Sequence, residues 1–399
     1  MKNIRLVVFN EPYWDKGLIY SQNILPLLQL VKTRNYSLDI FSFTSLPMLF
    51  KHQRQIQKTK NDLKQYNVSI RDFPILFYPT RFMLLRYLLI PYYYINVYFY
   101  IIFLNWKDKD LKELFYSIRS YQAALGFLKF YKKKERIIFD TRTDWIEENI
   151  NVGNFNPKGL TVRFWKRVEK DMLISFNKTL FISDLFRARV LERNGISLNE
   201  EKYYLVYNTI DYSHFQSINN DKTKDNFLYT GSLGHWNNIS IYLDLFLSLS
   251  EKMIDSKFII CTNSPSHKLM PILSMPKYDK IRSRVEVYFN IEYSKLPVYY
   301  NRCSYGLQLM NKKDSRVGVK FIEYVAAGLL PIVNFNVMGA AALVKKYGIG
   351  IILDEYDNID GLVNSIRKAK NNINLNNFNK LRELTDLSMI SKILEPIYS

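Results

Sequence analysis

The sequence predicts an α/β protein with two Rossmann-like domains, each built on a parallel sheet. Short apolar runs alternate with segments of helical periodicity along nearly the whole chain. This alternation is typical of parallel strands that are covered by helices on both faces. A polar stretch separates two such series, and 399 residues suffice for two domains. We expect domains at 1–212 and 227–375, a linker at 213–226, and a C-terminal helix at 376–399 that closes back toward the first domain.

In the first domain, each apolar run predicts a buried strand and each periodic segment predicts a helix. The predicted strands are 4–9, 38–43, 114–118, 137–139 and 180–182. Helical spacing of apolar residues predicts helices at 23–32 and 121–132, and the polar, basic segment 51–65 predicts an exposed helix.

The second domain repeats the pattern. The predicted strands are 227–230, 258–262, 285–289, 305–309, 330–335 and 349–353. Helices are predicted at 241–249 and 319–327, and Gly328 ends the second of them because glycine readily adopts the left-handed conformation found after helices.

The segment 82–104 is apolar and rich in aromatic residues, and three interpretations remain open for it. Only Arg86 and Asn96 interrupt it, so its length could span a bilayer. Pro91 and the many tyrosines favour instead a buried helix of the first domain or a helix lying at a membrane surface.

The chain is strongly basic: 56 Lys and Arg residues against 37 Asp and Glu residues give a net charge of +19, which predicts an anionic partner. Nucleic acid is disfavoured, since the sequence contains no zinc-finger spacing, RNP-like motif or compact basic helix. An anionic membrane and phosphorylated small molecules remain.

Metal and disulfide chemistry are not expected. The two cysteines, Cys261 and Cys303, lie in apolar runs and are predicted to be core residues, and the histidines have no metal-binding spacing. The N-terminus leads directly into a strand pattern rather than a signal peptide, so we expect a cytoplasmic protein.

In open parallel sheets, ligands bind at the carboxyl ends of the strands. In the segment 315–331, Gly318 precedes a predicted helix whose first amide groups can hold an anion. Lys320 adds a positive charge, and Glu323 lies on the same helical face, where it can accept hydrogen bonds from two ribose hydroxyls. Together they indicate a nucleotide site, while an ordinary helix with a solvated lysine is the alternative.

Three further places follow strands. Gly231, Ser232, Gly234 and His235 form a glycine turn that permits close approach of a phosphate or a sugar. In the first domain the predicted strands deliver, at their carboxyl ends, Arg119 and Ser120, and Asp140 and Arg142. These residues could position or deprotonate an acceptor, with Gly17 lining the same face, or Asp140 and Arg142 could be a structural ion pair.

Several segments resemble the bacterial glycosyltransferases of family 4, which have the GT-B fold. In the second domain these are the strand and turn 227–238 (FLYTGSLGHWNN), the segment 317–333 (VGVKFIEYVAAGLLPIV) and the segment 206–215 (VYNTIDYSHF). In the first domain the resemblance is less specific and rests on 10–22, 118–130, 139–150 and 180–190.

The resemblance implies a hexosyltransferase-type enzyme that transfers a sugar from a nucleotide diphosphate donor with retention, without a metal or cofactor. It assigns Glu323 to the donor ribose. The first acid of the family's paired motif is absent at Ser315, and Ser232 stands where arginine is common. Lys320 and Arg316 are then expected to neutralise the diphosphate. The expected catalytic residues are Lys320, which acts on the diphosphate, and Asp140 and Arg142, which act on the acceptor hydroxyl.

The expected role is surface polysaccharide assembly at the inner face of the cytoplasmic membrane, with a nucleotide sugar as donor, a glycan or lipid-linked acceptor and an anionic membrane surface as partners. The alternatives are another enzyme on the same fold, such as a sugar-nucleotide epimerase, a non-catalytic degenerate subunit, or, least favoured, a nucleic-acid-binding protein.

Overall fold

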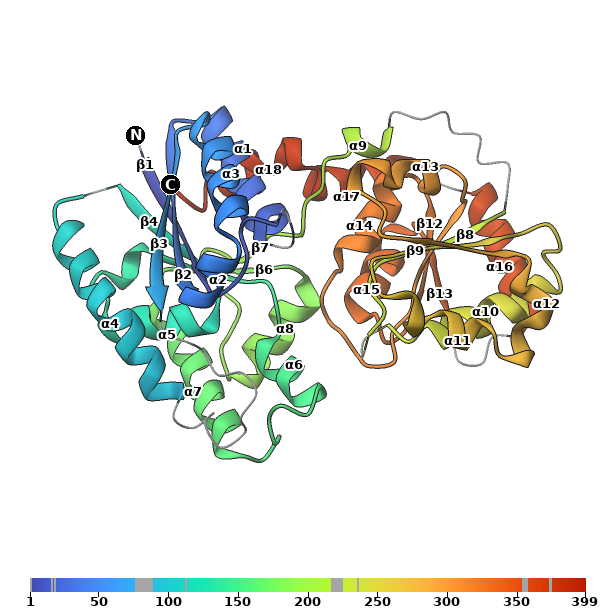
Figure 1. Ribbon diagram of the computed structural model, residues 1–399, viewed down its shortest axis with the longest axis horizontal. Helices are drawn as coiled ribbons and strands as arrows, with labels where there is room; N and C mark the ends of the chain where they lie inside the picture. Colours follow the sequence, from blue (N-terminus) through green and yellow to red (C-terminus); the bar gives the residue numbers. More distant parts are fainter. Residues whose placement is uncertain are drawn as a thin grey trace. The chain divides into compact units, whose positions relative to one another are not determined.

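The computed structural model describes residues 2–15, 17, 19–75, 89–111, 113–216, 225–234, 237–353, 358–372 and 375–399. The chain forms two compact units: unit 1 comprises Met1–Val206 and Leu387–Ser399, and unit 2 comprises Tyr207–Asp386. Each unit is a parallel sheet flanked by helices (Figure 1). The predicted α/β class with two Rossmann-like domains is therefore confirmed.

The sheet of unit 1 has seven parallel strands in the order β3-β2-β1-β4-β5-β6-β7. Their bounds are β1 (Lys2–Phe9), β2 (Tyr36–Ser45), β3 (Val68–Ile75), β4 (Leu114–Ile118), β5 (Ile137–Thr141), β6 (Lys178–Phe181) and β7 (Tyr203–Leu205). The sequence pattern predicts all but β3 and β7, the two edge strands. Edge strands need not be apolar on both faces: β3 alternates buried and open positions, and β7 has only three residues.

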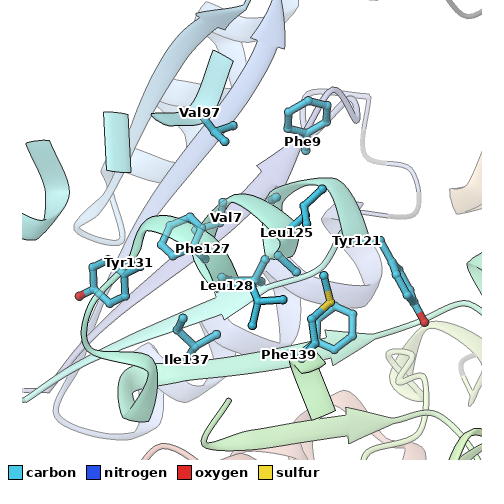
Figure 2. Close-up of a cluster of buried hydrophobic side chains, with 14 of the residues drawn as sticks. Val7, Phe9, Val97, Tyr121, Leu125, Phe127, Leu128, Tyr131, Ile137 and Phe139 are labelled. Atoms are coloured by element: carbon cyan, nitrogen blue, oxygen red, sulfur yellow. The ribbon is translucent and has the colours of Figure 1, made fainter. Parts of the chain in front are cut away.

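Unit 1 also contains helices on both faces of its sheet. They are α1 (Leu25–Thr33), α2 (Leu46–Lys51), α3 (Gln53–Lys64), α4 (Leu89–Lys107), α5 (Tyr121–Phe130), α6 (Trp145–Asn151), α7 (Leu160–Ser175), α8 (Asp184–Arg193) and α18 (Ile390–Leu394). Figure 2 shows α5 side chains such as Leu125 and Phe127 between β1, β5 and Val97 of α4. This packing holds the carboxyl ends of β1, β4 and β5 in place.

The segment 82–104 is described from Leu89 onward, where it forms α4, and residues 82–88 lie outside the described residues. Val97, Ile101 and Leu104 are buried, but Ile95, Phe99 and Trp106 are exposed. Among the described residues, no helix has the length and apolarity needed to cross a bilayer. The helix is therefore buried along one side only.

The C-terminal segment 376–399, expected as one helix, is broken into two. Helix α17 ends at Thr385, whose carbonyl accepts a hydrogen bond of 3.0 Å from the backbone N–H of Ile210. Helix α18 then packs its Ile390 and Leu394 into the core beside α1 of unit 1. The return of the C-terminus to the first domain is thus confirmed.

The sheet of unit 2 has six parallel strands in the order β10-β9-β8-β11-β12-β13. The strands are β8 (Phe227–Thr230), β9 (Phe258–Thr262), β10 (Val285–Phe289), β11 (Tyr305–Gln308), β12 (Leu330–Asn334) and β13 (Ile351–Leu353). The predicted strands coincide with them to within two residues, because each is a local apolar run. Cys261 and Cys303 are buried and free, as predicted.

The helices of unit 2 connect these strands. They are α9 (Ser213–Gln216), α10 (Ile239–Ser250), α11 (Met270–Leu273), α12 (Asp279–Arg282), α13 (Leu296–Tyr300), α14 (Val319–Ala326), α15 (Met338–Tyr347), α16 (Ile359–Asn371) and α17 (Leu375–Thr385). Helix α14 follows the loop after β11, so its amino end lies at the carboxyl edge of the sheet.

Candidate functional site

In unit 2 the loop after β8 and the first turn of α14 are in direct contact through Gly231 and Lys320. Gly231 has a φ of +134°, and a Cβ at this position would overlap Nζ of Lys320. Only glycine adopts this backbone conformation readily, and only glycine leaves space for the ammonium group. Two segments far apart in the sequence therefore form one site.

Lys320 is buried, and no carboxylate among the described residues lies within salt-bridge distance of its ammonium group. Its Nζ lies 5.2 Å from the centre of the Tyr229 ring. Burial lowers the pKa of Lys320 to about 8, although the nearby Glu323 carboxylate acts in the opposite direction. A buried cation with no described carboxylate within salt-bridge distance is suited to an anionic ligand.

Glu323 lies one turn further along α14 and is buried. Its Oε2 accepts a hydrogen bond of 2.8 Å from the hydroxyl of Tyr300, which is 3.0 Å from the hydroxyl of Thr230 at the end of β8. Burial raises the pKa of Glu323 to about 7, while the Tyr300 hydrogen bond and Lys320 oppose that rise. The carboxylate thus keeps one oxygen for a further donor.

Gly318 is the N-cap residue of α14, and no described side chain caps the first turn. A Cβ at 318 would lie 2.8 Å from Nε2 of Gln308, so a larger residue would crowd this amide. Oε1 of Gln308 and Oδ1 of Asn208 are buried and have no hydrogen-bond partner among the described residues. Free helix amides and unpartnered amide oxygens together outline a polar ligand site.

Arg316 is committed elsewhere. Its guanidinium binds both oxygens of Asp314, with Nε to Oδ1 at 2.8 Å and Nη2 to Oδ2 at 2.7 Å. This fork-shaped ion pair makes Lys320 the more available cation in this part of the site. Ser315, where the resemblance leads us to expect an acid, is buried.

In the glycine turn, Ser232 is exposed, and its carbonyl accepts a hydrogen bond of 2.8 Å from Tyr229. A Cβ at Gly234 would meet no atom, so close packing does not demand glycine there. His235 lies outside the described residues.

In unit 1, Asp140 and Arg142 form a buried ion pair at the end of β5, with Oδ1 and Nε 2.7 Å apart. The other oxygen of Asp140 accepts a hydrogen bond of 2.7 Å from Nδ2 of Asn23. Asp140 is therefore held in place by the Arg142 guanidinium at one oxygen and by the Asn23 amide at the other. The geometry favours the structural pair that the sequence left open.

The network continues from Asn23 to Arg119. Nη1 of Arg119 donates to Asn23 Oδ1 at 2.6 Å, and Nε donates to Glu11 Oε2 at 3.0 Å. Burial lowers the pKa of Arg119 and raises that of Glu11. The sequence analysis did not single out Glu11 or Asn23, because neither belongs to a recognisable motif. The position of Glu11, two residues after the end of β1, could have pointed to it, since ligands bind at the carboxyl ends of parallel strands.

A pocket of about 260 Å³ opens beside this network within unit 1. Its lining includes Glu11, Arg119, Ser120, Thr143 and Trp145. Ser120 also caps α5, accepting a hydrogen bond of 3.3 Å from the N–H of Ala123. Asp140 and Arg142 lie behind this pocket rather than on its wall.

Gly17 does not line the pocket. Its backbone N–H donates to Oδ1 of Asp15 at 2.7 Å, and its carbonyl accepts from Ser21, so the residue forms a local turn. Among the described residues no group of three or more His, Cys, Asp or Glu side chains could hold a metal ion.

The two parallel-sheet units in sequence define the GT-B fold, and solved structures agree. The chain matches HepE from Anabaena in complex with UDP at a TM-score of 0.66 and 12% identity, covering 100% of this chain and 99% of that one. It matches a glycosyltransferase from Rickettsia africae at a TM-score of 0.64 and 12% identity, covering 100% and 97%. WaaG, a glycosyltransferase involved in lipopolysaccharide biosynthesis, matches at a TM-score of 0.60 and 12% identity, covering 100% and 99%.

At the level of sequence, residues 212–382 match the family model described as Glycosyl transferases group 1. This part of the chain, which makes up most of unit 2, is therefore a domain of that group. None of the curated proteins compared with the chain matches it.

Proposed function

We propose that this protein is a retaining, hexosyltransferase-type glycosyltransferase that moves a sugar from a nucleotide diphosphate donor to a glycan or lipid-linked acceptor. The observation that carries the proposal is the buried Lys320 beside Gly231, one helical turn from the buried Glu323, in the part of the chain that matches the Glycosyl transferases group 1 model. In this proposal Lys320 binds the phosphates and Glu323 binds the ribose.

In this proposal the donor diphosphate binds at the amino end of α14. The free amides after Gly318 and the Lys320 ammonium neutralise its charge, and Glu323 accepts hydrogen bonds from the ribose hydroxyls. Gln308 and Asn208 offer buried oxygens that are available to donor groups of the ligand. Two structures of HepE from Anabaena contain UDP, which supports a nucleotide donor of this kind.

The chemical step asks mainly for stabilisation of the leaving group. As the bond between the sugar carbon and the diphosphate breaks, negative charge builds on the diphosphate, which in this proposal lies beside Lys320 and the first amides of α14. The protein supplies this positive charge itself, so we propose that neither a metal nor a cofactor takes part. We assign Arg119 and Ser120 to the acceptor side and give the Asp140–Arg142 pair a positioning role.

The proposed setting is surface polysaccharide assembly at the inner face of the cytoplasmic membrane. WaaG is involved in lipopolysaccharide biosynthesis, which supports an acceptor of this class. The net charge of +19 supports attraction to anionic lipid, since each well-placed basic residue contributes about 1 kcal/mol.

A thermal-shift screen against nucleotide diphosphate sugars tests the donor. A bound donor raises the unfolding temperature because it binds only the folded state, and a hit should also release free nucleoside diphosphate when an acceptor is added. A screen in which no nucleotide sugar stabilises the protein would contradict the proposal. Conversion of the hit into its epimer without release of nucleoside diphosphate would favour the epimerase alternative.

Replacing Glu323 should weaken donor binding without unfolding the protein. Charge-assisted hydrogen bonds contribute about 1.5–3 kcal/mol, so Glu323→Ala should raise the Kd of UDP-glucose about ten- to a hundredfold in calorimetry. Glu383→Ala, at an exposed position of α17, is the matched control and should leave the Kd unchanged. Unchanged binding in Glu323→Ala would refute the ribose assignment.

Donor affinity should depend on pH with a maximum between the two shifted pKa values. Below about 7, Glu323 in the free protein takes up a proton and loses its strength as an acceptor; above about 8, Lys320 loses the proton that attracts the diphosphate. The affinity for UDP-glucose, measured by calorimetry across this range, should therefore fall on both sides. In Glu323→Gln the loss of affinity below about pH 7 should disappear. If the affinity of this variant still fell at low pH, a group other than Glu323 would be responsible.

A further inference from the structure

Helix α4 presents an apolar stripe to solvent. Five of its side chains recur at helical spacing and are strongly exposed: Ile95 (62%), Phe99 (71%), Ile102 (44%), Phe103 (46%) and Trp106 (75%). Residues four, seven, eight and eleven positions apart fall on one side of a helix, so these side chains form one continuous surface. We call this surface the α4 stripe.

The opposite side of α4 is anchored, so the stripe cannot turn inward. Val97, Ile101 and Leu104 are buried in the core of unit 1, and Figure 2 shows Val97 near the side chains of α5. A Cβ on Gly126 of α5 would overlap the Val97 side chain, so the two helices pack at close range. Figure 1 shows α4 on the outside of unit 1.

Basic residues border the carboxyl end of the stripe. Nζ of Lys133 donates to the carbonyl of Lys109 at 2.6 Å, and Asn105 of α4 bonds the backbone of Phe130 and Lys132 at 2.8 and 3.0 Å. These bonds join the end of α4 to the loop after α5. The basic side chains gathered there form the basic rim, which consists of Lys107, Lys109, Lys129, Lys132, Lys133, Lys134 and Arg136.

The acidic residues nearby do not cancel this charge. Asp108 is buried against Arg5, and the exposed acids in the described parts of 107–113 and 129–136 are Asp110, Glu113 and Glu135. The rim has seven basic residues and only three exposed acids nearby, so its net charge is positive.

We propose that the α4 stripe and the basic rim form a docking surface for an anionic phospholipid membrane. Aromatic and aliphatic side chains would enter the interface between headgroups and acyl chains, where tryptophan is favoured, while the lysines bind the headgroups. A second copy of the chain fits this surface poorly, because two basic rims would face each other. The inference rests on the proposed function only for its lipid-linked acceptor, since docking itself needs no donor.

Co-sedimentation with vesicles tests the proposal. The wild type should bind vesicles that contain phosphatidylglycerol and should bind pure phosphatidylcholine weakly. Phe99→Ser/Trp106→Ser should lower partitioning at least about tenfold, and Lys132→Gln/Lys133→Gln should lower it about tenfold at low salt with a smaller effect at high salt. Ile254→Ser is the matched control, because Ile254 is equally exposed at 74% but lies in unit 2.

Trp106→Phe separates insertion from mere attraction. Its vesicle binding should persist, but the blue shift of tryptophan emission on binding should shrink. Wild-type protein that does not bind anionic vesicles, or a serine double variant that binds them as well as the wild type, would overturn the proposal. So would a concentration-dependent dimer that is lost in the serine double variant while vesicles are not bound.

Calorimetry with UDP-glucose keeps this test separate from the proposed function. The docking variants should bind UDP-glucose with wild-type affinity, so loss of vesicle binding with intact donor binding supports docking alone. If the wild type did not bind a donor, the proposed function would be refuted. The docking proposal would still be tested by the vesicle experiment alone.

Discussion

Replacement of Lys320 by methionine should raise the Kd of UDP-glucose by about two orders of magnitude and lower kcat/KM for transfer at least as much. The ammonium lies against Gly231 without an acidic partner among the described residues, so a bound diphosphate would be its counterion. A charge-assisted hydrogen bond in such a site contributes about 1.5–3 kcal/mol, and the gain increases as charge builds on the leaving group. Calorimetry and release of nucleoside diphosphate measure the two effects.

The fold should tolerate this change. The pKa of Lys320 is lowered to about 8, so its protonated form is disfavoured by folding, and removing the charge costs no stability below that pH. Lys345→Met, at an exposed position of α15, is the matched control and should bind the donor normally. Gly231→Ala should reproduce the loss by displacing the ammonium. If Lys320→Met bound UDP-glucose with wild-type affinity, the assignment of the diphosphate to this position would be wrong.

The largest effect on stability is expected in unit 1. Asp140→Ala should lower its free energy of unfolding by about 3–5 kcal/mol, because it leaves the buried Arg142 without its carboxylate. Four of the five tryptophans belong to unit 1, so urea unfolding followed by tryptophan fluorescence reports mainly on this unit.

Two further variants make the stability result interpretable. Asp184→Ala breaks a half-exposed pair with Arg187 and should cost less than about 1 kcal/mol. Asp140→Leu/Arg142→Met replaces both charges with apolar groups and should recover most of the loss. If Asp140→Ala were as stable as the wild type but inactive in transfer, Asp140 would be a catalytic group after all.

The interior strands of both units could be predicted from the sequence because a buried parallel strand is a local apolar run. The same holds for the spacing of Lys320 and Glu323, which lie on one face of α14 because that is a property of any helix. Edge strands such as β3 escape the pattern, since one side of an edge strand has no neighbouring strand to bury it.

The partners of the site residues could not be predicted in this way. Tyr300 donates to Glu323 from a different helix, and Asn23 reaches Asp140 across 117 positions of the chain. The sequence suggested Arg316 as a second cation, and the structure pairs it with Asp314.

The sequence by itself determined the α/β class, the two domains, the predicted strands and the Gly318–Lys320–Glu323 spacing. The tertiary structure decided which charges are neutralised, which carboxyl has a raised pKa and which side of α4 faces solvent. The physical reason is that helical spacing and strand formation depend on neighbouring residues, whereas burial and counterions depend on contacts between residues far apart in the chain.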